Sequence, residues 1–347
     1  MLRVSVVGGS GYVGGEALRL LLGHPEMEVV QVTSESNAGK PVFVTHPNLR
    51  GTTDLRFSSI ADLEPVDCMF LALPHGESQR RIDELSTHAS MILDLAADFR
   101  LHDPQLYQRF YGEEHHCPER LNEFVYSIPE LHRERIRSAR MLSGAGCIAT
   151  CTITSLYPLF AAGVVRDQTA FVDAKVASSA AGAKANPGSH HPERAGCLRS
   201  FKPTAHRHTA EITENLTVAD ATPHVHLSAT STDSVRGILT TSQLFLKDNL
   251  SEIDIRGIYR EHYGREPFVR IIKERRGIFR YPEPKLLAGT NFVDIGFELE
   301  PDTGRLVVLG AIDNLVKGSA GNVIQGLNII NGWDERTGLA FPGLHPV

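Results

Sequence analysis

The 347-residue sequence lacks the features that mark membrane proteins and nucleic-acid-binding proteins. No apolar run approaches the ~20 residues needed to span a bilayer, and no basic region followed by a cleavable apolar segment stands at the N-terminus. The net charge of −6 offers no excess of cations for nucleic acid or for an anionic membrane. We therefore expect a cytoplasmic protein with neither nucleic acid nor membrane as a partner.

Cysteine is scarce as well. The five cysteines are odd in number and form no C-x-x-C pair, which speaks against a disulfide framework. We expect reduced thiols. Hydrophobic residues at 41% and charged residues at 22% are typical of a globular enzyme, and 347 residues exceed one ordinary core, so two domains are expected.

The N-terminal segment has the pattern of a dinucleotide-binding turn. An apolar run at 2–7 precedes the glycine-rich segment 8–14, and apolar residues at helical spacing follow. Glycines let the backbone approach a pyrophosphate, and the start of the helix stabilises its charge. A second apolar run, 28–32, leads into the loop 34–36, where the adenosine ribose is expected. Glu35 there either bonds a ribose hydroxyl, and would then repel a 2′-phosphate, or is a solvated carboxylate.

Two further apolar runs, 66–73 and 91–95, are typical of strands buried on both faces of a parallel sheet. Polar residues follow each run. Because ligands collect at the carboxyl ends of such strands, His75, Asp98 and Arg100 are candidate site residues. The alternative is a structural ion pair between Asp98 and Arg100 or a neighbour.

The rest of the chain indicates a different second domain. Segment 102–140 is polar and irregular and predicts a surface excursion before a last strand near Met141. Later strand-like runs, separated by polar segments and a helical pattern, predict a mixed, largely antiparallel sheet with helices on one side. These runs are 170–176, 224–229, 237–246, 291–299 and 306–312, with helical patterns at 251–263 and 318–331.

Segment 143–159 places a thiol at a predicted helix start. Gly144 and Gly146 permit a tight turn, and Cys147 opens an apolar pattern of helical spacing. Backbone N–H groups and the helix dipole favour thiolate over thiol there, and the same N–H groups can hold an oxyanion. Cys147 is therefore a candidate nucleophile, and a small buried hydrophobe is the alternative reading.

Segment 178–215 combines small residues with histidine, arginine and lysine, which suits a phosphate or carboxylate ligand. His208 lies beside a predicted helix start and is a candidate acid or base, or a surface histidine. Paired histidines raise the possibility of zinc, at 190/191, 206/208 and 224/226. We expect no metal, because no cysteine or carboxylate stands at metal-ligand spacing.

Four segments in order, 8–14, 97–101, 146–150 and 206–208, together resemble the N-acetyl-γ-glutamyl-phosphate reductase family over essentially the whole chain. Within it the chain is most similar to the lysine-pathway branch, whose members reduce aminoadipyl 6-phosphate held on an amino-group carrier protein. The segments that carry this second likeness are 181–185, 189–196, 202–204 and 311–318.

The resemblance implies an α/β fold, with an N-terminal Rossmann domain joined to a glyceraldehyde-3-phosphate-dehydrogenase-like α+β catalytic domain. The first domain is expected at 1–147, with 318–347 packing back on it, and the second at 148–317. The implied reaction is reduction by NADPH through a thioester, with phosphate released. A small acidic carrier protein and a homo-oligomer, dimer or tetramer, are the implied partners.

Residue roles follow from the resemblance by position. Cys147 takes the place of the nucleophile and His208 that of the acid/base. The implied cofactor contacts are Gly8, Ser10, Gly11, Tyr12, Val13, Ser34, Glu35, Ser36 and Asn314. Candidate cations and polar groups for the substrate are Arg100, Arg194, Lys202, His206 and Arg207.

Two alternatives stay open. Relatives commonly have arginine in the loop that here reads Glu35-Ser36, so NAD is not excluded beside NADP, although Lys40 can compensate. The substrate is either the carrier-bound lysine precursor or the free acetylglutamyl phosphate of arginine biosynthesis, or both, since a pocket discriminates one methylene by only about 1–3 kcal/mol. A nucleotide-binding regulator without catalysis would lack Cys147 or His208, and both are present.

Overall fold

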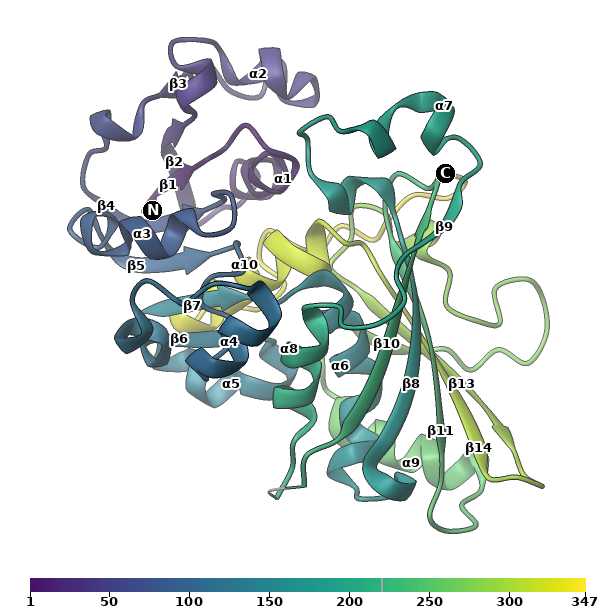
Figure 1. Ribbon diagram of the computed structural model, residues 1–347. Helices are drawn as coiled ribbons and strands as arrows, with labels where there is room; N and C mark the ends of the chain where they lie inside the picture. Colours follow the sequence, from purple (N-terminus) through teal and green to yellow (C-terminus); the bar gives the residue numbers. More distant parts are fainter. Residues whose placement is uncertain (220) are drawn as a thin grey trace. The chain divides into compact units, whose positions relative to one another are not determined.

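The computed structural model describes residues 1–219 and 221–347, which divide into two compact units (Figure 1). The first unit comprises Met1–Ala145 and Ser319–Ala340, and the second Gly146–Gly318 and Phe341–Val347. The division falls two residues before the expected boundary at 147, because the helix that begins there packs on strands of the second unit. The last seven residues also belong to the second unit rather than to the first.

The first unit is built on a seven-stranded sheet in the order β3-β2-β1-β4-β5-β7-β6, and every pairing is parallel. Its strands are β1 (Leu2–Val7), β2 (Met27–Thr33), β3 (Phe57–Ser58), β4 (Val66–Leu71), β5 (Ala89–Asp94), β6 (Phe124–Ser127) and β7 (Met141–Gly144). Its helices are α1 (Tyr12–Leu21), α2 (Val42–Thr45), α3 (Glu77–Leu85), α4 (Pro104–Tyr111), α5 (Pro129–Arg137) and α10 (Gly321–Ile330). The last of these, α10, packs on α5 and β7.

Strand order reverses beside β1, which pairs with β2 on one side and β4 on the other. Ligands of such sheets bind at the carboxyl ends of the strands at this switch point. Gly8, directly after β1, has φ +82°, and a side chain there would lie 2.6 Å from the carbonyl oxygen of Ala72, directly after β4. The turn after β1 and the loop after β4 therefore lie against each other at the switch point.

The predicted surface excursion at 102–140 is wrong. This segment contains α4, α5 and the edge strand β6, and the ring of Phe124 stacks on Phe99 at 3.9 Å. Four residues are too few for β6 to show a strand period, and the two helices carry mostly polar residues. These elements belong to the first unit because of their packing, since β6 pairs with β7 and α5 packs on α10.

The second unit contains a seven-stranded mixed sheet in the order β12-β13-β14-β11-β8-β10-β9. Its strands are β8 (Thr169–Val176), β9 (Leu198–Lys202), β10 (His224–Thr232), β11 (Ile238–Phe245), β12 (Val269–Ile271), β13 (Val293–Glu300) and β14 (Arg305–Ile312). Its helices are α6 (Cys147–Ala161), α7 (His191–Arg194), α8 (His208–Leu216) and α9 (Glu252–Tyr263). The predicted α/β class, with a parallel sheet and a second mixed sheet, is confirmed.

Helix α6 is the central helix of the second unit, and it is buried around nearly its whole circumference. Pro158 lies inside it and lacks the N–H that would bond the carbonyl of Thr154. The hydroxyl of Tyr263 on α9 donates to that carbonyl at 2.8 Å, and the hydroxyl of Tyr259 donates to the carbonyl of Ser155 at 2.7 Å. These bonds give the carbonyl groups near Pro158 hydrogen-bond donors, and they fix α6, which carries Cys147, against α9.

The cationic segment 178–215 holds more regular structure than its composition indicates, namely α7, β9 and the start of α8. All five residues of β9 are exposed. Because neither face of the strand is buried, its sequence does not alternate between apolar and polar residues, and no strand pattern could be recognised. The described cysteines form no disulfide. Among the helices described, none is both long and apolar enough to cross a membrane.

Candidate active site

Cys147 is the first residue of α6. The helix is capped by Gly146 in extended conformation, with no side-chain cap, so first-turn amides such as that of Ala149 have no acceptor within the helix. The thiol is partly exposed. A side chain on Gly318 would lie 2.7 Å from the Cβ of Cys147, so the chain before α10 passes directly against the cysteine and only glycine fits.

His208 begins α8, which packs on α6. Its buried imidazole occupies the place that a side chain at position 146 would take, since a Cβ on Gly146 would lie 2.6 Å from Nε2 of His208. The structure therefore brings the predicted acid/base against the residue that precedes the predicted nucleophile.

Glu211 connects the two helices and was not among the predicted site residues. Its carboxylate is fully buried, Oε2 accepts a hydrogen bond from the amide of Gly146 at 2.8 Å, and Oε1 lies 3.8 Å from Nε2 of His208. One carboxylate thus faces both the turn before Cys147 and the imidazole. Its spacing of three residues from His208, on a predicted helix, places both on one face and is the signal that could have identified it.

His206 enters the site as a neutral imidazole. Its Nδ1 accepts a hydrogen bond from the amide of His208 at 3.1 Å. Burial, together with the nearby cations Arg207 and Lys202, lowers the pKa of His206 to about 4. The bond from the amide of His208 fixes His206 at the start of α8, and its contact with the substrate stays a prediction.

The four predicted cations are distributed over both units. Arg207 precedes α8, and Lys202 ends β9 with its side chain exposed. Arg194 on α7 donates from Nη1 to the hydroxyl of Ser231. Arg100 is buried in the first unit, where its Nε donates to the carbonyl of Gly144 at 2.8 Å. Arg207 and Lys202 are thus the cations that the second unit places beside the histidines.

The glycine turn of the first unit offers an open helix start. Gly11 caps α1 without a side-chain bond, and a side chain there would meet nothing within 4 Å. Ser34 Oγ donates to Ser10 Oγ at 2.8 Å, which ties the predicted ribose loop to the turn. Unpaired first-turn amides, a clear approach and a linked ribose loop fit a dinucleotide pyrophosphate. Tyr12 is 48% exposed beside this opening, and Val13 is half-buried.

Glu35 is more than a solvated carboxylate. Its Oε1 accepts a hydrogen bond from the amide of Ile60 at 2.8 Å, which fixes the loop while the side chain stays exposed. Lys40, the cation that can compensate for the missing arginine, belongs to the same loop, because its Nζ donates to Oδ1 of Asn37 at 3.3 Å. Ser36 is exposed between them. The loop thus presents one charge of each sign.

Asn314 lies buried in the second unit. Its Oδ1 accepts from the amide of Gly237 at 2.8 Å, and its Nδ2 donates to the hydroxyl of Ser179 at 2.9 Å. These bonds join the segment after β14 to the loops at the ends of β8 and β11. Its predicted contact with the cofactor remains a proposal.

The candidates at the ends of β4 and β5 form a structural cluster. Oδ1 of Asp98 lies 2.7 Å from Nδ1 of His75, and its oxygens also accept from the amides of Gly76 and Gln79. Burial raises the pKa of Asp98, but these bonds outweigh it and hold the pKa below its ordinary value. Asp98 therefore pairs with His75, and its carboxylate holds the start of α3.

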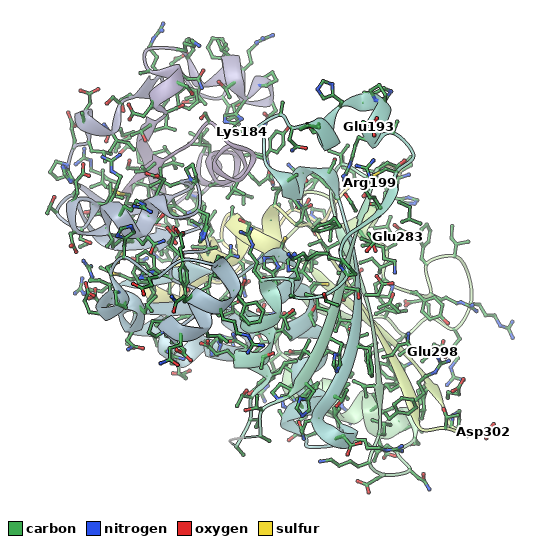
Figure 2. The ribbon with its side chains drawn as sticks, viewed as in Figure 1. Lys184, Glu193, Arg199, Glu283, Glu298 and Asp302 are labelled. Atoms are coloured by element: carbon green, nitrogen blue, oxygen red, sulfur yellow. The ribbon has the colours of Figure 1, made fainter. Side chains whose placement is uncertain are left out.

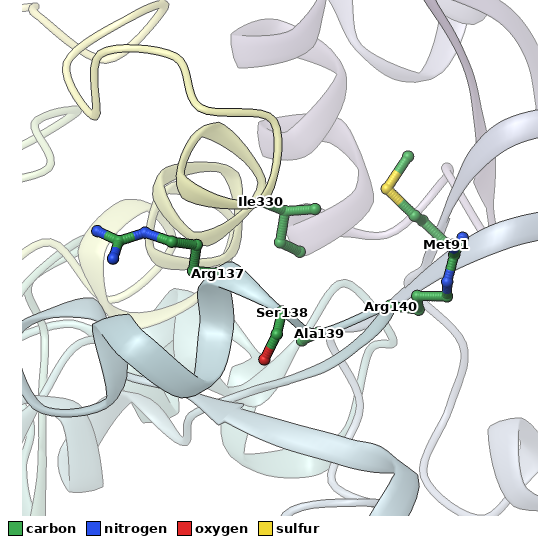
Figure 3. Close-up of a pocket in the computed structure, with 6 residues that line it drawn as sticks. All are labelled: Met91, Arg137, Ser138, Ala139, Arg140 and Ile330. Carbon is green, nitrogen blue, oxygen red and sulfur yellow. The ribbon is translucent and has the colours of Figure 1, made fainter.

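One concavity in the first unit has neither a thiol nor an imidazole among its lining residues. A cavity of about 240 Å³ in the first unit is lined by Met91, Arg137, Ser138, Ala139, Arg140 and Ile330 (Figure 3). It lies at the amino-terminal ends of β5 and β7, whereas the glycine turn follows the carboxyl-terminal end of β1. Within the described chain, no three residues among His, Cys, Asp and Glu gather to hold a metal ion.

Both units match models of one protein family, the semialdehyde dehydrogenases. The model of the semialdehyde dehydrogenase NAD binding domain matches residues 3–139, and that of the semialdehyde dehydrogenase dimerisation domain matches residues 147–314. An aspartate semialdehyde dehydrogenase II from Vibrio cholerae has a TM-score of 0.72 at 14% identity, covering 96% of this chain and 99% of its own. The aspartate semialdehyde dehydrogenase with NADP from Candida albicans has a TM-score of 0.69, also at 14% identity, over 95% and 98%. At this identity the solved structures show the fold alone.

Sequence relatives are far closer. The [LysW]-L-2-aminoadipate 6-phosphate reductase of Deinococcus radiodurans is 56% identical over 99% of this chain and 98% of its own length. The putative [LysW]-L-2-aminoadipate 6-phosphate reductase of Thermomicrobium roseum is 53% identical over the whole of both chains. A relative in Cenarchaeum symbiosum, 46% identical over the whole of both chains, is a putative [LysW]-L-2-aminoadipate/[LysW]-L-glutamate phosphate reductase.

Proposed function

Because the chain belongs to the semialdehyde dehydrogenase family, an oxidoreductase family, we propose that it reduces carrier-bound L-2-aminoadipate 6-phosphate to the 6-semialdehyde, with release of phosphate, in lysine biosynthesis. The observation that carries the proposal is the full-length identity of 56% and 53% to reductases named for this substrate. The thiol, imidazole and carboxylate of Cys147, His208 and Glu211 supply the groups that the chemistry needs.

The first half-reaction is acyl transfer to sulfur. The thiolate of Cys147 attacks the acyl carbonyl, the C–O bond to phosphate breaks, and phosphate leaves with the bonding electrons, so a thioester remains on the enzyme. First-turn amides of α6 such as that of Ala149 can stabilise the tetrahedral oxyanion, because the helix has no acceptor for them. Arg207 and Lys202, which lie near His206, are our candidates to hold the departing phosphate.

The second half-reaction needs a proton. A bound nicotinamide dinucleotide would supply the hydride that brings the thioester to the aldehyde oxidation level. His208 donates a proton to the resulting oxyanion, which gives a neutral thiohemiacetal. When the C–S bond then breaks, the hydroxyl proton returns to His208, the sulfur leaves as the thiolate of Cys147, and the aldehyde is released. Glu211 is placed to orient the imidazole and to offset its positive charge, while its second oxygen fixes the turn at Gly146.

We assign the cofactor as a nicotinamide dinucleotide, in agreement with the NAD binding domain model over residues 3–139. Gly8, Ser10, Gly11 and the loop from Ser34 would hold it, because they surround the open start of α1. Lys40 is placed to pair with the 2′-phosphate of NADP, whereas Glu35 opposes that phosphate. We therefore propose NADPH as a cofactor, with NADH used comparably.

Carrier-bound glutamate phosphate is the second candidate substrate, since relatives at 43–47% identity are named for both carrier-bound acids. One assay decides among the alternatives. Reduction by NADPH is compared for carrier-bound aminoadipyl phosphate, carrier-bound glutamyl phosphate and free N-acetylglutamyl phosphate, at equal concentrations. We expect the first to give the highest kcat/KM, and a preference for the free acetylglutamyl phosphate would overturn the lysine-pathway assignment.

We further propose a homo-oligomer, dimer or tetramer, in the cytoplasm. The dimerisation domain model covers residues 147–314, and the second sheet exposes Phe171 and Phe245, at 50% and 39%, on its strands β8 and β11. Such exposed apolar groups favour burial against another copy. The five cysteines form no disulfide, and thiols stay reduced in the cytoplasm. Sedimentation analysis that found only monomer at micromolar concentration would contradict the assembly.

A further inference from the structure

His46 is a buried imidazole of the first unit that the proposed chemistry does not use. It lies between α2 and the short 3₁₀ turn Pro47–Leu49, and it is 9% exposed. Because a proline follows it, its backbone avoids helical values, with φ −116° and ψ 81°, so α2 ends at Thr45. Figure 1 draws this part of the chain in purple, with α1, α2 and β3 labelled, and Figure 2 shows the same view with side chains as sticks.

The ring of His46 is fixed by its packing. It lies directly against the backbone of α1, since a Cβ added to Gly15 would lie 2.4 Å from Cε1 of His46, and only glycine fits there. The ring of Phe57 on β3 meets the imidazole edge-on, with 6.4 Å between the two centroids. Close packing on a helix backbone and on a second ring holds the imidazole in one orientation.

In this orientation the imidazole reaches the glycine turn after β1. Nε2 of His46 lies 2.7 Å from the carbonyl oxygen of Gly9. Because a carbonyl oxygen can only accept a hydrogen bond, Nε2 carries the proton and donates it. The amide of Gly9 donates to the carbonyl of Thr33 at 2.9 Å. Both peptide groups that flank Gly9 are therefore held, one by the end of β2 and the other by His46.

The bond from His46 sets the direction of the next amide. In a trans peptide the carbonyl of Gly9 and the N–H of Ser10 point in opposite directions, so the N–H of Ser10 points away from His46. Among the described residues this amide has no acceptor, whereas the hydroxyl of Ser10 accepts from Ser34. The amide of Ser10 stands next to the open start of α1, where the first-turn amides are available to an anion.

We propose that His46 is a positioning residue for the cofactor, which rests on the proposed function with its nicotinamide dinucleotide. It holds the peptide between Gly9 and Ser10 so that the amide of Ser10 binds the pyrophosphate. His46 acts through the turn and not by contact with the cofactor. Because NADH and NADPH share the pyrophosphate, the histidine contributes equally to the binding of both, in contrast to Glu35 and Lys40, which face the 2′-phosphate question alone.

The test measures the Kd of NADPH and of NADH for the purified enzyme without substrate, by fluorescence titration. His46→Leu removes the donor, and His46→Gln supplies an amide N–H of similar reach. The matched control is His24→Leu. His24 is another buried histidine of the same unit, but it follows the far end of α1, and its Nε2 bonds Oδ1 of Asn328 at 3.0 Å.

We expect His46→Leu to raise both Kd values about tenfold, because the turn loses a buried hydrogen bond, and His46→Gln to restore them to within about threefold of the wild type. His24→Leu should leave both Kd values unchanged. Thermal melting shows that each variant is folded. If His46→Leu does not fold, His46→Asn, whose amide is one bond too short for the carbonyl of Gly9, takes its place with the same expected rise.

Unchanged Kd values without the donor, an equal rise in His24→Leu, or no rescue by His46→Gln would overturn the role of His46. A rise confined to NADPH would also overturn it, because the effect would then lie at the 2′-phosphate. The wild-type enzyme reports the proposed function separately. Binding of neither cofactor by the wild type would contradict the cofactor assignment and this role with it, whereas normal wild-type binding with unaffected His46 variants would contradict this role alone.

Discussion

Helices α1 and α6 begin alike and differ in what occupies their first turn. Each follows a strand, is capped by a glycine in extended conformation, and lacks a side-chain cap. At α1 a Cβ added to Gly11 would meet no protein atom within 4 Å, so the space beside this glycine is open. At α6 the space beside Gly146 is filled by the imidazole of His208, and the amide of Gly146 is bonded to Glu211.

The difference shows how one local pattern serves two kinds of chemistry. An open helix start keeps its amides for an anion that arrives from solution, such as a pyrophosphate. At α6 the chain itself fills the helix start, and we propose that this one is the reaction centre, because an imidazole and a carboxylate lie against the residue that precedes the thiol. Variants at matched positions of the two helices can therefore separate cofactor binding from chemistry.

The largest expected effect is at Cys147, which has no counterpart among the first residues of α1. Cys147→Ser should reduce the reduction of the acyl phosphate, and the phosphate-dependent oxidation of the aldehyde in the reverse direction, by roughly 10⁴-fold or more, because the alcohol is a far weaker nucleophile than a thiolate. Cofactor affinity, measured by fluorescence titration, should be unchanged, since the dinucleotide is assigned to the first unit. Substantial activity in the serine variant would exclude a thioester at this residue.

Gly146→Ala and Gly11→Ala test the comparison directly. A methyl group at 146 would lie 2.6 Å from Nε2 of His208 and must displace the imidazole, so kcat should fall by about 10²-fold with cofactor affinity retained. A methyl group at 11 meets no protein atom within 4 Å, so stability should not change, but cofactor Kd should rise about tenfold as the approach is blocked. Steady-state kinetics and titration measure the two effects, and an identical phenotype for both would refute the distinction.

Glu211→Gln should reduce kcat by about tenfold to thirtyfold. The amide keeps an acceptor for the N–H of Gly146 and removes the negative charge beside His208. Glu211→Ala removes both and should lose more activity and some thermal stability, because the buried amide of Gly146 is left without its acceptor. If Glu211→Gln kept full activity, the carboxylate would act only on the turn and not on the imidazole.

The smallest effect concerns the ribose loop beside α1. Glu35→Gln keeps an acceptor for the amide of Ile60 and removes the charge that opposes a 2′-phosphate, so the ratio of kcat/KM for NADPH over NADH should rise several-fold, up to about tenfold. Lys40→Ala should lower that ratio. Matched kinetics with both cofactors measure it. A wild-type preference of a hundredfold for NADPH would contradict comparable use of NADH.

Several parts of the site were predictable because their signals are local. The run of apolar residues before Gly8, the helical pattern after Cys147 and the helix start near His208 each depend on neighbours in the chain. Glycine at a turn and a polar residue at a helix start have the same physical meaning in any fold. The assignment of strands β1, β4 and β8, each within two residues of its predicted bounds, rests on the same kind of signal.

Other parts depend on contacts between distant segments. The exposed strand β9 and the short edge strand β6 left no periodic pattern, and their place is fixed by pairing with β10 and β7. Burial near Arg207 and Lys202 makes His206 neutral, which its sequence neighbours do not indicate. The bond from Glu35 to the amide of Ile60 spans 25 residues.

The sequence by itself determined that two helices begin at glycine turns, that one of them carries a thiol, and that a basic histidine segment follows. Only the tertiary structure decided which helix start is open and which is filled. Packing of α8 on α6 places His208 and Glu211 against Gly146, more than sixty residues away along the chain, and leaves Gly11 with clear space. A helix start exposes the same amides wherever it occurs, and what they bind is set by the segments that the fold brings to them.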